Sequence, residues 1–528
     1  MSLNDRIYKL RTAVKMTREQ FAEEFGVSRQ TVLKWENGTS HPELSKLINI
    51  SRRFDISLDS LILDRNMRMI EEFKGNYGKK TISPNYSNMH FWESYSSAII
   101  DEYRQSVDEG LDIEEYKDIF FDISKLPQGA IKKKFGDVIF EIITEAKKRE
   151  NYKYNEPSTL EEIKALSKPY NIGKKIDTDR LESKINGAWV GRVCGCMLGK
   201  SVEGIHTDEL IPLLKNSGNY PMHRYILKSD IDAVDTSKFK YDLINRPYAD
   251  TIDGMPPDDD TNYTVLAQQI IDDYGFDFTP LNVLEAWVKY QPKEAYCTAE
   301  RVAFCNFIKG YEPPCSAIYK NPYREWIGAQ IRTDYYGYIN PGNPEAAADM
   351  AWRDASISHI KNGIYGAMFV AAALSTAAIT DNIEDIILSG LAHVPHTSRF
   401  YEDVMQVVNG YKNGISCKEC FENIHEKYDE YTGYGWCHTN PNAIITVASL
   451  LYGEGNYGKS ICMAVETGFD TDCNGATVGS IFGMAHGIES IPEYWQRPIK
   501  DKLQTSIFGV GTVSISERVA KTLTQMRK

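Results

Sequence analysis

Apolar residues at helical spacing alternate with helix-starting and helix-stopping residues through the first 64 positions. Thr17 and Gln20 stand in the order of a capping box, and Ser28 is a second N-cap residue. Gly26 follows the apolar face of the second segment and is expected to end it. The pattern predicts five short helices, around residues 4–14, 17–26, 28–38, 43–54 and 58–63.

Two short helices joined by a tight glycine-containing turn have the geometry of a helix-turn-helix. The stretch TREQFAEEFGVSRQTVLKWENG, followed by HPELSKLINISRRFDISLDSLI, resembles the lambda-repressor/Cro-like helix-turn-helix family over essentially the whole domain. The resemblance implies binding of a double-stranded DNA operator, as a homodimer on a two-fold site. The residues that would face DNA are Ser28, Arg29, Gln30, Thr31 and Lys34, with Thr17 and Gln20 near phosphate. The alternative is a helical bundle used for protein contacts.

Residues 66–178 mix aromatic-rich pieces with charged helical pieces and contain no motif that carries chemistry. Short basic runs there are interpreted as solvated helix faces. We expect a helical connector that packs on the region C-terminal to it. The predicted division is therefore 1–65, 66–178 and 179–528.

Glycines recur every fourth position in two distant segments. Gly187, Gly191, Gly195 and Gly199 form one stripe, and Gly475, Gly479 and Gly483 form another. Each glycine costs a helix about 1 kcal/mol against alanine. The stripes therefore indicate close backbone approach, either to a crossing helix or to a ligand.

Carboxylates gather at the start of two predicted helices. In PDDDTNYT, Asp258, Asp259 and Asp260 precede apolar residues at helical spacing, and Asp470 and Asp472 precede the second glycine stripe. D-x-D-x-N-G also opens a calcium EF-hand, but Ile481 stands where that loop needs a bidentate glutamate. The triplet alone is compatible with a solvated helix N-terminus. If the two acidic turns converge, a two-metal site with oxygen ligands is the simplest neutralisation.

The order of LGxxxE, DDT and GxDTD across residues 185–487 resembles the ADP-ribosylglycohydrolase family. The resemblance implies an all-α orthogonal bundle that holds two Mg²⁺ ions, or Mn²⁺ in some members, against the ribose hydroxyls of an ADP-ribosyl ligand. It also implies that the bond at the anomeric carbon is hydrolysed. Asp259 and Asp260 match the first metal-binding pair, Asp470 and Asp472 the second, and Glu203 the acidic residue beside the scissile bond.

Two positions depart from the family's pattern. Asp258 and Cys473 stand where threonine or serine is usual, and both are counted with the candidate ligands. A thiol is a poor ligand for a hard cation, whereas Asp258 adds a compensating charge. Glycosidic cleavage needs a carboxylate near the sugar and an oriented water. Glu203, or a metal-bound aspartate such as Asp260, is expected to activate that water.

Composition and charge limit the number of domains and the cellular location that we expect. The chain has 528 residues and a net charge of −13, so two or three domains are expected. Up to Asp64 there are ten basic and nine acidic residues, so the excess negative charge lies in the rest of the chain. The net charge of −13 therefore does not exclude DNA binding through local contacts of the first 64 residues. The ten cysteines form no secreted disulfide pattern, the first residues lack an apolar signal core, and the longest apolar run is too short for a bilayer. We expect a cytoplasmic protein with no membrane segment.

Two functions from different classes fit these motifs. The first is a DNA-binding transcriptional regulator fused to a metal-dependent hydrolase of an ADP-ribosyl or related ribosyl substrate. The second is a regulator whose body binds an ADP-ribose-like or nucleoside effector without turnover. Retention of the four metal aspartates and Glu203 favours turnover, whereas Asp258 and Cys473 favour a sensor.

Overall fold

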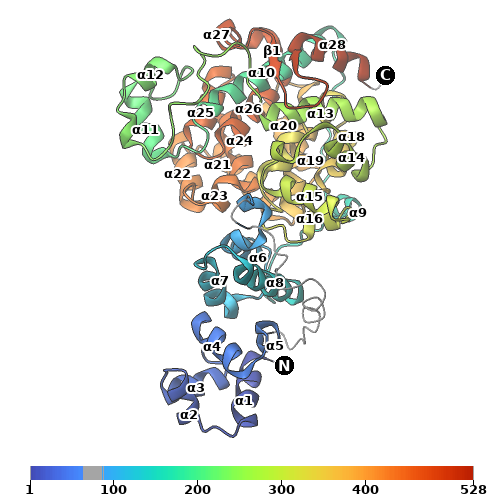
Figure 1. Ribbon diagram of the computed structural model, residues 1–528. Coiled ribbons are helices and arrows are strands. Elements are labelled where there is room, and N and C mark those ends of the chain that lie inside the picture. Colours follow the sequence, from blue (N-terminus) through green and yellow to red (C-terminus); the bar gives the residue numbers. More distant parts are fainter. Residues whose placement is uncertain (1, 63–85, 87–88, 527–528) are drawn as a thin grey trace. The chain divides into compact units, whose positions relative to one another are not determined.

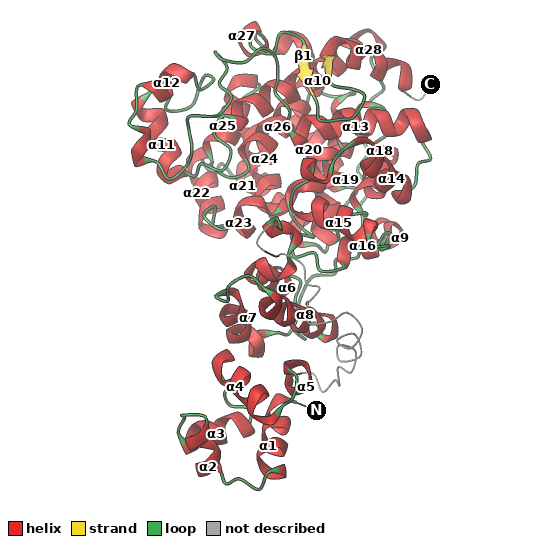
Figure 2. Ribbon diagram, viewed as in Figure 1, coloured by secondary structure: helices red, strands yellow, loops and turns green. Residues whose placement is uncertain are grey.

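The structure is a computed structural model that describes residues 2–62, 86 and 89–526. It divides into two compact units, residues 1–152 and 153–528, which we call the head unit and the body. The predicted all-α fold is confirmed: helices dominate the described chain, and one pair of three-residue antiparallel strands is present in it (Figure 2). No helix among the described residues is long and apolar enough to cross a membrane. The predicted boundary at 65/66 lies outside the described residues, and the three-part division stays a prediction.

The head unit begins with the five predicted helices. Its helices are α1 (Leu3–Ala13), α2 (Arg18–Glu24), α3 (Arg29–Glu36), α4 (Leu44–Phe54), α5 (Leu58–Ile62), α6 (Ile99–Asp108), α7 (Lys117–Ser124) and α8 (Ala130–Glu145). Thr17 and Gln20 form the predicted capping box at α2, and the Ser28 side chain accepts a hydrogen bond from the Thr31 N–H at α3. Local sequence signals therefore determine where these helices start.

Helices α6 to α8 complete the core of the head unit. Leu47 of α4 belongs to the same buried apolar cluster as Phe120 of α7 and Ile139 of α8. Residues 89–152 of the expected connector lie in the head unit, and its packing on the region C-terminal to it stays a prediction. A head of about 60 residues builds only a small core alone, and α7 covers apolar surface that α4 leaves open.

The body contains the remaining helices and both strands (Figure 1). They are α9 (Leu160–Ala165), α10 (Thr178–Lys200), α11 (Thr207–Asn216), α12 (Lys228–Asp232), α13 (Asp259–Tyr274), α14 (Pro280–Tyr290), α15 (Thr298–Ile308), α16 (Cys315–Ile318), α17 (Asp334–Tyr338), α18 (Pro344–Ala355), α19 (Lys361–Ala377), α20 (Ile383–Leu391), α21 (Arg399–Lys412), α22 (Cys417–Lys427), α23 (Gly433–Cys437), α24 (Thr439–Tyr452), α25 (Tyr457–Glu466), α26 (Thr471–His486), α27 (Glu493–Gln496), β1 (Lys502–Gln504), β2 (Thr512–Ser514) and α28 (Ile515–Gln525). Short 3-10 helices lie at Phe91–Glu93, Tyr95–Ser97, Glu114–Tyr116, Thr236–Lys238, Lys293–Ala295, Ile327–Arg332 and Ile488–Ser490.

The two glycine stripes face each other where α10 and α26 cross in antiparallel fashion (Figure 1). A Cβ built on Gly195 would lie 1.9 Å from the Gly475 carbonyl oxygen, and one on Gly191 would lie 2.2 Å from the Gly479 oxygen. No side chain fits between the helices, which explains the glycines. At the end of the stripe, Gly199 meets Thr471, so the C-terminal end of α10 lies beside the first turn of α26.

The loop before α13 is anchored to the short strand pair. The Met255 N–H donates to the Lys502 oxygen at 2.9 Å, and the Gln504 N–H donates to the Met255 oxygen at 3.0 Å. Three residues later, Asp258 is the N-cap of α13. The fold thus brings three helix ends together: the C-terminal end of α10 and the N-terminal ends of α13 and α26.

Candidate functional site

Asp258 begins α13 and is neutralised by a lysine from α10. Its Oδ1 accepts a hydrogen bond from the Asp260 N–H at 2.9 Å, and its Oδ2 lies 2.6 Å from the Lys200 ammonium. The side chain is buried. Capping and ion pairing together compensate the cost of burying this carboxylate.

Asp260 is fully buried against Arg192. The Arg192 guanidinium lies 3.1 Å from Asp260 Oδ1 and 3.0 Å from a carboxylate oxygen of Asp334, and it also donates to the Asp260 carbonyl oxygen at 2.8 Å. Asp260 Oδ2 has no hydrogen-bond partner among the described residues. One arginine between two aspartates leaves one negative charge in excess. Asp260 Oδ2 is therefore an available ligand atom for a cation.

The second acidic turn is positioned by α24 and α10. The Asn442 Oδ1 accepts hydrogen bonds from the Asp470 N–H at 3.3 Å and from the Asn474 side chain at 2.7 Å. The Thr471 hydroxyl donates to the Gly199 oxygen at 3.0 Å. Asp472 is 2% exposed, and its Oδ1 has no hydrogen-bond partner among the described residues.

Predicted ligands from the two acidic turns lie close enough together to bind the same cation. Three sets have ligand atoms within 4.8 Å of one another: Asp258, Asp259, Asp260 and Asp472; Asp260, Asp472 and Cys473; and Cys196, Asp258 and Asp260. Asp470 and Glu203 fall outside these sets but lie close enough to shift the pKa values of their members. We call the members of the three sets, together with Lys200, Glu203 and Asp470, the acidic centre. Its carboxylate-rich donors and its two unpaired buried oxygens fit divalent cations.

Electrostatics at the acidic centre also favour a cation. Burial, followed by repulsion from neighbouring carboxylates, raises the pKa values of Asp259 and Asp472 well above their usual range. Burial raises the pKa of Asp260 likewise, although Arg192 opposes the rise. Burial raises the pKa of Asp470 to about 6, against hydrogen bonds from neighbouring side chains that include the Cys473 thiol. Positive charge placed here would relieve these carboxylates.

Glu203 follows α10 and belongs to the acidic centre. Its side chain is accessible to solvent, but the protein around it removes much of its hydration and raises its pKa to about 7, with Asp258 and Asp470 adding to the rise and Lys200 opposing it. Its carbonyl oxygen accepts a hydrogen bond from the Arg246 guanidinium at 2.6 Å. A carboxyl group with a pKa near neutrality can exchange a proton with water at physiological pH.

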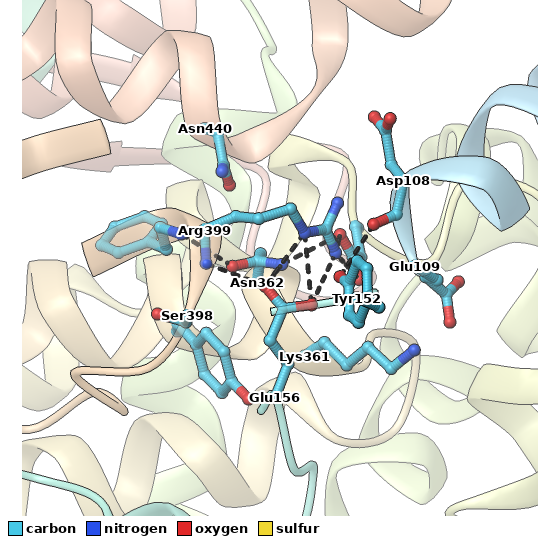
Figure 3. A network of polar contacts seen from close by, with 12 residues as sticks. Asp108, Glu109, Tyr152, Glu156, Lys361, Asn362, Ser398, Arg399 and Asn440 are labelled. Carbon is cyan, nitrogen blue, oxygen red and sulfur yellow. Dashed lines mark hydrogen bonds and ion pairs between the residues drawn. The ribbon is translucent and has the colours of Figure 1, made fainter. Parts of the chain in front are cut away.

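A buried ion network contacts the first turn of α24, and Figure 3 shows its members Arg399, Glu156 and Asn362. The Arg399 guanidinium lies 2.9 Å from Glu156 and 2.7 Å from Glu325, and the Asn362 amide donates to both carboxylates, at 3.0 and 3.1 Å. His438, the N-cap of α24, faces Glu325 at 3.4 Å. The network therefore braces the first turn of α24, which carries Asn442. His438, Asn440 and Asn442 are buried and held by internal hydrogen bonds.

Sequence reasoning missed Arg192 and Cys196. Arg192 carried a usable signal, because a charge inside a glycine-striped and otherwise apolar helix needs a buried partner. Cys196 offered no comparable signal, since its role depends on segments far away in the chain.

The predicted DNA-facing residues lie on the surface of α2 and α3. Thr17, Gln20, Ser28, Arg29, Gln30 and Lys34 are exposed, and Thr31 is half-buried. Arg29 forms an exposed ion pair with Glu19. Beneath them, buried Glu36 accepts from Arg11 and Arg18 at 2.5 Å each and ties α3 to α1 and α2. Sequence reasoning missed this triad.

Comparisons with known proteins find a family match for the body and another for the N-terminal helices of the head unit. The ADP-ribosylglycohydrolase family model matches residues 177–526, and a helix-turn-helix model matches residues 7–61. An uncharacterized protein of Archaeoglobus fulgidus is 23% identical over 329 residues, which are 61% of this chain and 93% of that protein. The HTH-type transcriptional activator BcrR of Enterococcus faecalis is 33% identical over 82 residues, 16% of this chain, and the match spans only 40% of the activator. A solved ADP-ribosylglycohydrolase-related protein complex aligns over 66% of this chain and 98% of its own, with 17% identity and a TM-score of 0.40.

Proposed function

This chain belongs to the ADP-ribosylglycohydrolase family, and from that premise we propose that its body hydrolyses the glycosidic bond of an ADP-ribosyl or related ribosyl substrate. We propose further that its helix-turn-helix binds an operator, so that the protein is a DNA-binding regulator with a hydrolase body. The observation that carries the hydrolase proposal is the convergence of Asp258–Asp260 with Asp472 from the other end of the body.

The acidic centre would hold two divalent cations of the Mg²⁺ or Mn²⁺ type. Asp258, Asp259, Asp260, Asp470, Asp472 and Cys473 are the candidate ligands. When bound, such cations supply charge that orients the sugar hydroxyls and acidifies water. Arg192 and Lys200 hold two of these carboxylates in place, through Asp260 and Asp258 respectively.

Glu203 is the proposed general base. Its solvent access lets water reach the carboxylate, and its raised pKa, about 7, allows it to accept a proton from that water near neutral pH. The water oxygen bonds to the anomeric carbon as the bond to the leaving group breaks, and the proton passes from Glu203 to the departing group. Asp260 is the alternative base, but its ion pair with buried Arg192 favours a positioning role.

The hydrolase proposal is tested by product release. Purified protein with Mg²⁺ or Mn²⁺ is incubated with ADP-ribosylated arginine and serine peptides, NAD⁺ and nucleosides, and products are read by chromatography and mass spectrometry. We expect cation-dependent ADP-ribose or ribosyl product that disappears on chelation and in Asp259→Ala. Asp277→Ala, an exposed aspartate of the same region, is the matched control and should keep activity.

Cys473 and the Asp258–Lys200 ion pair favour a second function, a sensor without turnover. A sensor would bind an ADP-ribose-like or nucleoside ligand with cation, release no product, and change its affinity for DNA. Ligand binding without product in the same panel would replace the hydrolase proposal with this one.

The DNA proposal is tested by selecting bound sequences from a random duplex pool and measuring affinity by fluorescence anisotropy. A two-fold symmetric site bound by a homodimer is expected. Arg29→Ala should weaken specific binding by about 1–3 kcal/mol, because arginine reads guanine through two hydrogen bonds. Its ion pair with Glu19 is exposed and weak enough for DNA to replace. Lys125→Ala, exposed on the same unit beyond α7, should leave affinity unchanged.

A further inference from the structure

Two thiols of the acidic centre come from two facing helices. Cys196 of α10 is fully buried, and Cys473 of α26 is 5% exposed. Cys196 lies within 4.8 Å of ligand atoms of Asp258 and Asp260, and Cys473 lies within the same distance of Asp260 and Asp472. The glycine contact between α10 and α26 brings both thiols close to Asp260, the one carboxylate that belongs to both of their sets.

The buried carboxylates beside these thiols have unused coordinating atoms. Asp260 is 0% exposed and Asp472 is 2% exposed, yet Asp260 Oδ2 and Asp472 Oδ1 have no hydrogen-bond partner among the described residues. Both residues belong to the set that contains Cys473. An unpaired buried carboxylate oxygen is costly, so these two atoms point to a ligand at this position.

The donor types distinguish two neighbouring positions. Asp258, Asp259, Asp260 and Asp472 form an all-oxygen set, which suits a hard cation such as Mg²⁺. Asp260, Asp472 and Cys473 form a mixed set of oxygen and sulfur, which suits borderline cations such as Zn²⁺ and Co²⁺. Asp260 and Asp472 belong to both sets, so the positions are adjacent and share carboxylates.

We propose that Asp260, Asp472 and Cys473 form a mixed carboxylate–thiolate position that selects a borderline divalent cation over Mg²⁺. Cys196 supplies a second thiol on the side of Asp258. The thiol proton leaves to solvent as the metal–sulfur bond forms. This inference rests on the proposed function for its setting, because it concerns which cation occupies one of the two positions proposed above.

The test measures binding rather than turnover, so its failure is distinguishable from failure of the hydrolase proposal. Reduced full-length protein is stripped with chelator under anaerobic conditions and titrated with Co²⁺. A near-ultraviolet sulfur-to-cobalt charge-transfer band is expected in addition to the weak visible bands. Cys473→Ser, which exchanges sulfur for oxygen, should abolish most of the band, and Cys462→Ser, a buried cysteine of α25 outside the ligand sets, should keep it.

Competition between Cd²⁺ and Mg²⁺, followed by equilibrium dialysis with metal analysis, supplies the second readout. Loss of an outer partner already lowers metal affinity about 10- to 100-fold, so loss of the thiolate should shift the preference for Cd²⁺ over Mg²⁺ by at least about tenfold in Cys473→Ser. Cys196→Ser is compared in the same way and should shift the preference less. Cobalt bound without the charge-transfer band in the unmodified protein overturns the proposal, as does an unchanged preference in a folded Cys473→Ser.

Discussion

The head unit and the body carry their candidate chemistry in different ways. In the head unit, the candidate DNA contacts fall within residues 17–34, on two consecutive helices, and all but half-buried Thr31 are exposed. In the body, the candidate metal ligands come from residues 258–260 and 470–473 and are mostly buried. The exposed set depends on local caps, whereas the buried set depends on helix crossing and on compensating charges. Changes that break buried partners should therefore have much larger effects in the body than cap removal has in the head unit.

The largest effect is expected from Arg192→Met. This change leaves Asp260 and Asp334 buried without their shared guanidinium, so the body should lose about 3–5 kcal/mol of unfolding free energy. Urea unfolding followed by circular dichroism measures the loss, and DNA binding by anisotropy should persist. Arg497→Met, which removes an exposed ion pair with Glu493, is the control and should cost no more than about 1 kcal/mol. Equal losses in both variants would remove the contrast between buried and exposed charges.

A smaller loss is expected from Gly195→Ala. The added methyl group would meet the Gly475 carbonyl oxygen at 1.9 Å, so α10 and α26 must separate, at a cost of roughly 1–3 kcal/mol. Because both acidic turns depend on this crossing, cation affinity measured by calorimetry should fall as well. Gly433→Ala adds a methyl group 3.5 Å from Trp326 and should change neither quantity. If Gly195→Ala is destabilised but its cation affinity is unaltered, the geometry of the acidic centre does not depend on the packing of α10 against α26.

Metal-free protein should lose stability as pH rises. Glu203 and Asp470, with folded pKa values of about 7 and about 6, keep protons that the unfolded chain releases near pH 4. The stabilisation is complete below the unfolded pKa and is lost as pH rises through 6 to 7, by about 1–3 kcal/mol for Asp470. Urea unfolding across pH 4 to 8 checks this. Saturating Mg²⁺ should reverse the trend because it binds the ionised form, and parallel profiles with and without Mg²⁺ would argue against a cation there.

The smallest effect is expected from Thr17→Ala in the head unit. It removes one partner of the capping box at α2 and should cost about 1 kcal/mol of head stability. Thermal unfolding of the head unit and specific DNA affinity should both fall slightly, while product release stays unchanged. Thr12→Ala, whose exposed hydroxyl donates to the Tyr8 and Lys9 carbonyl oxygens within α1, is the matched control. A change in hydrolysis on loss of the Thr17 cap would show that the two regions are coupled.

The secondary structure of both regions was predictable because its signals are local. Neighbouring residues identify the capping box of Thr17 and Gln20 and the Ser28 cap, which helped to predict the five short helices of the head unit. Neighbouring residues likewise identify the acidic starts of α13 and α26 in the body. Each glycine stripe likewise indicated a close contact. Pairing of the two stripes was not predictable, since every-fourth glycines identify a face but not its partner.

By itself, the sequence determined the helices, their caps, the family resemblance and the residue types offered for chemistry. Tertiary structure alone decided which of them meet: Lys200 with Asp258, Arg192 with Asp260 and Asp334, and Asn442 with the turn of Asp470. It also placed α6 to α8 in the core of the head unit. The physical reason is range. Caps and helical periodicity act within one or two turns, whereas burial, charge compensation and a thiol's distance from a carboxylate arise only when remote segments pack together.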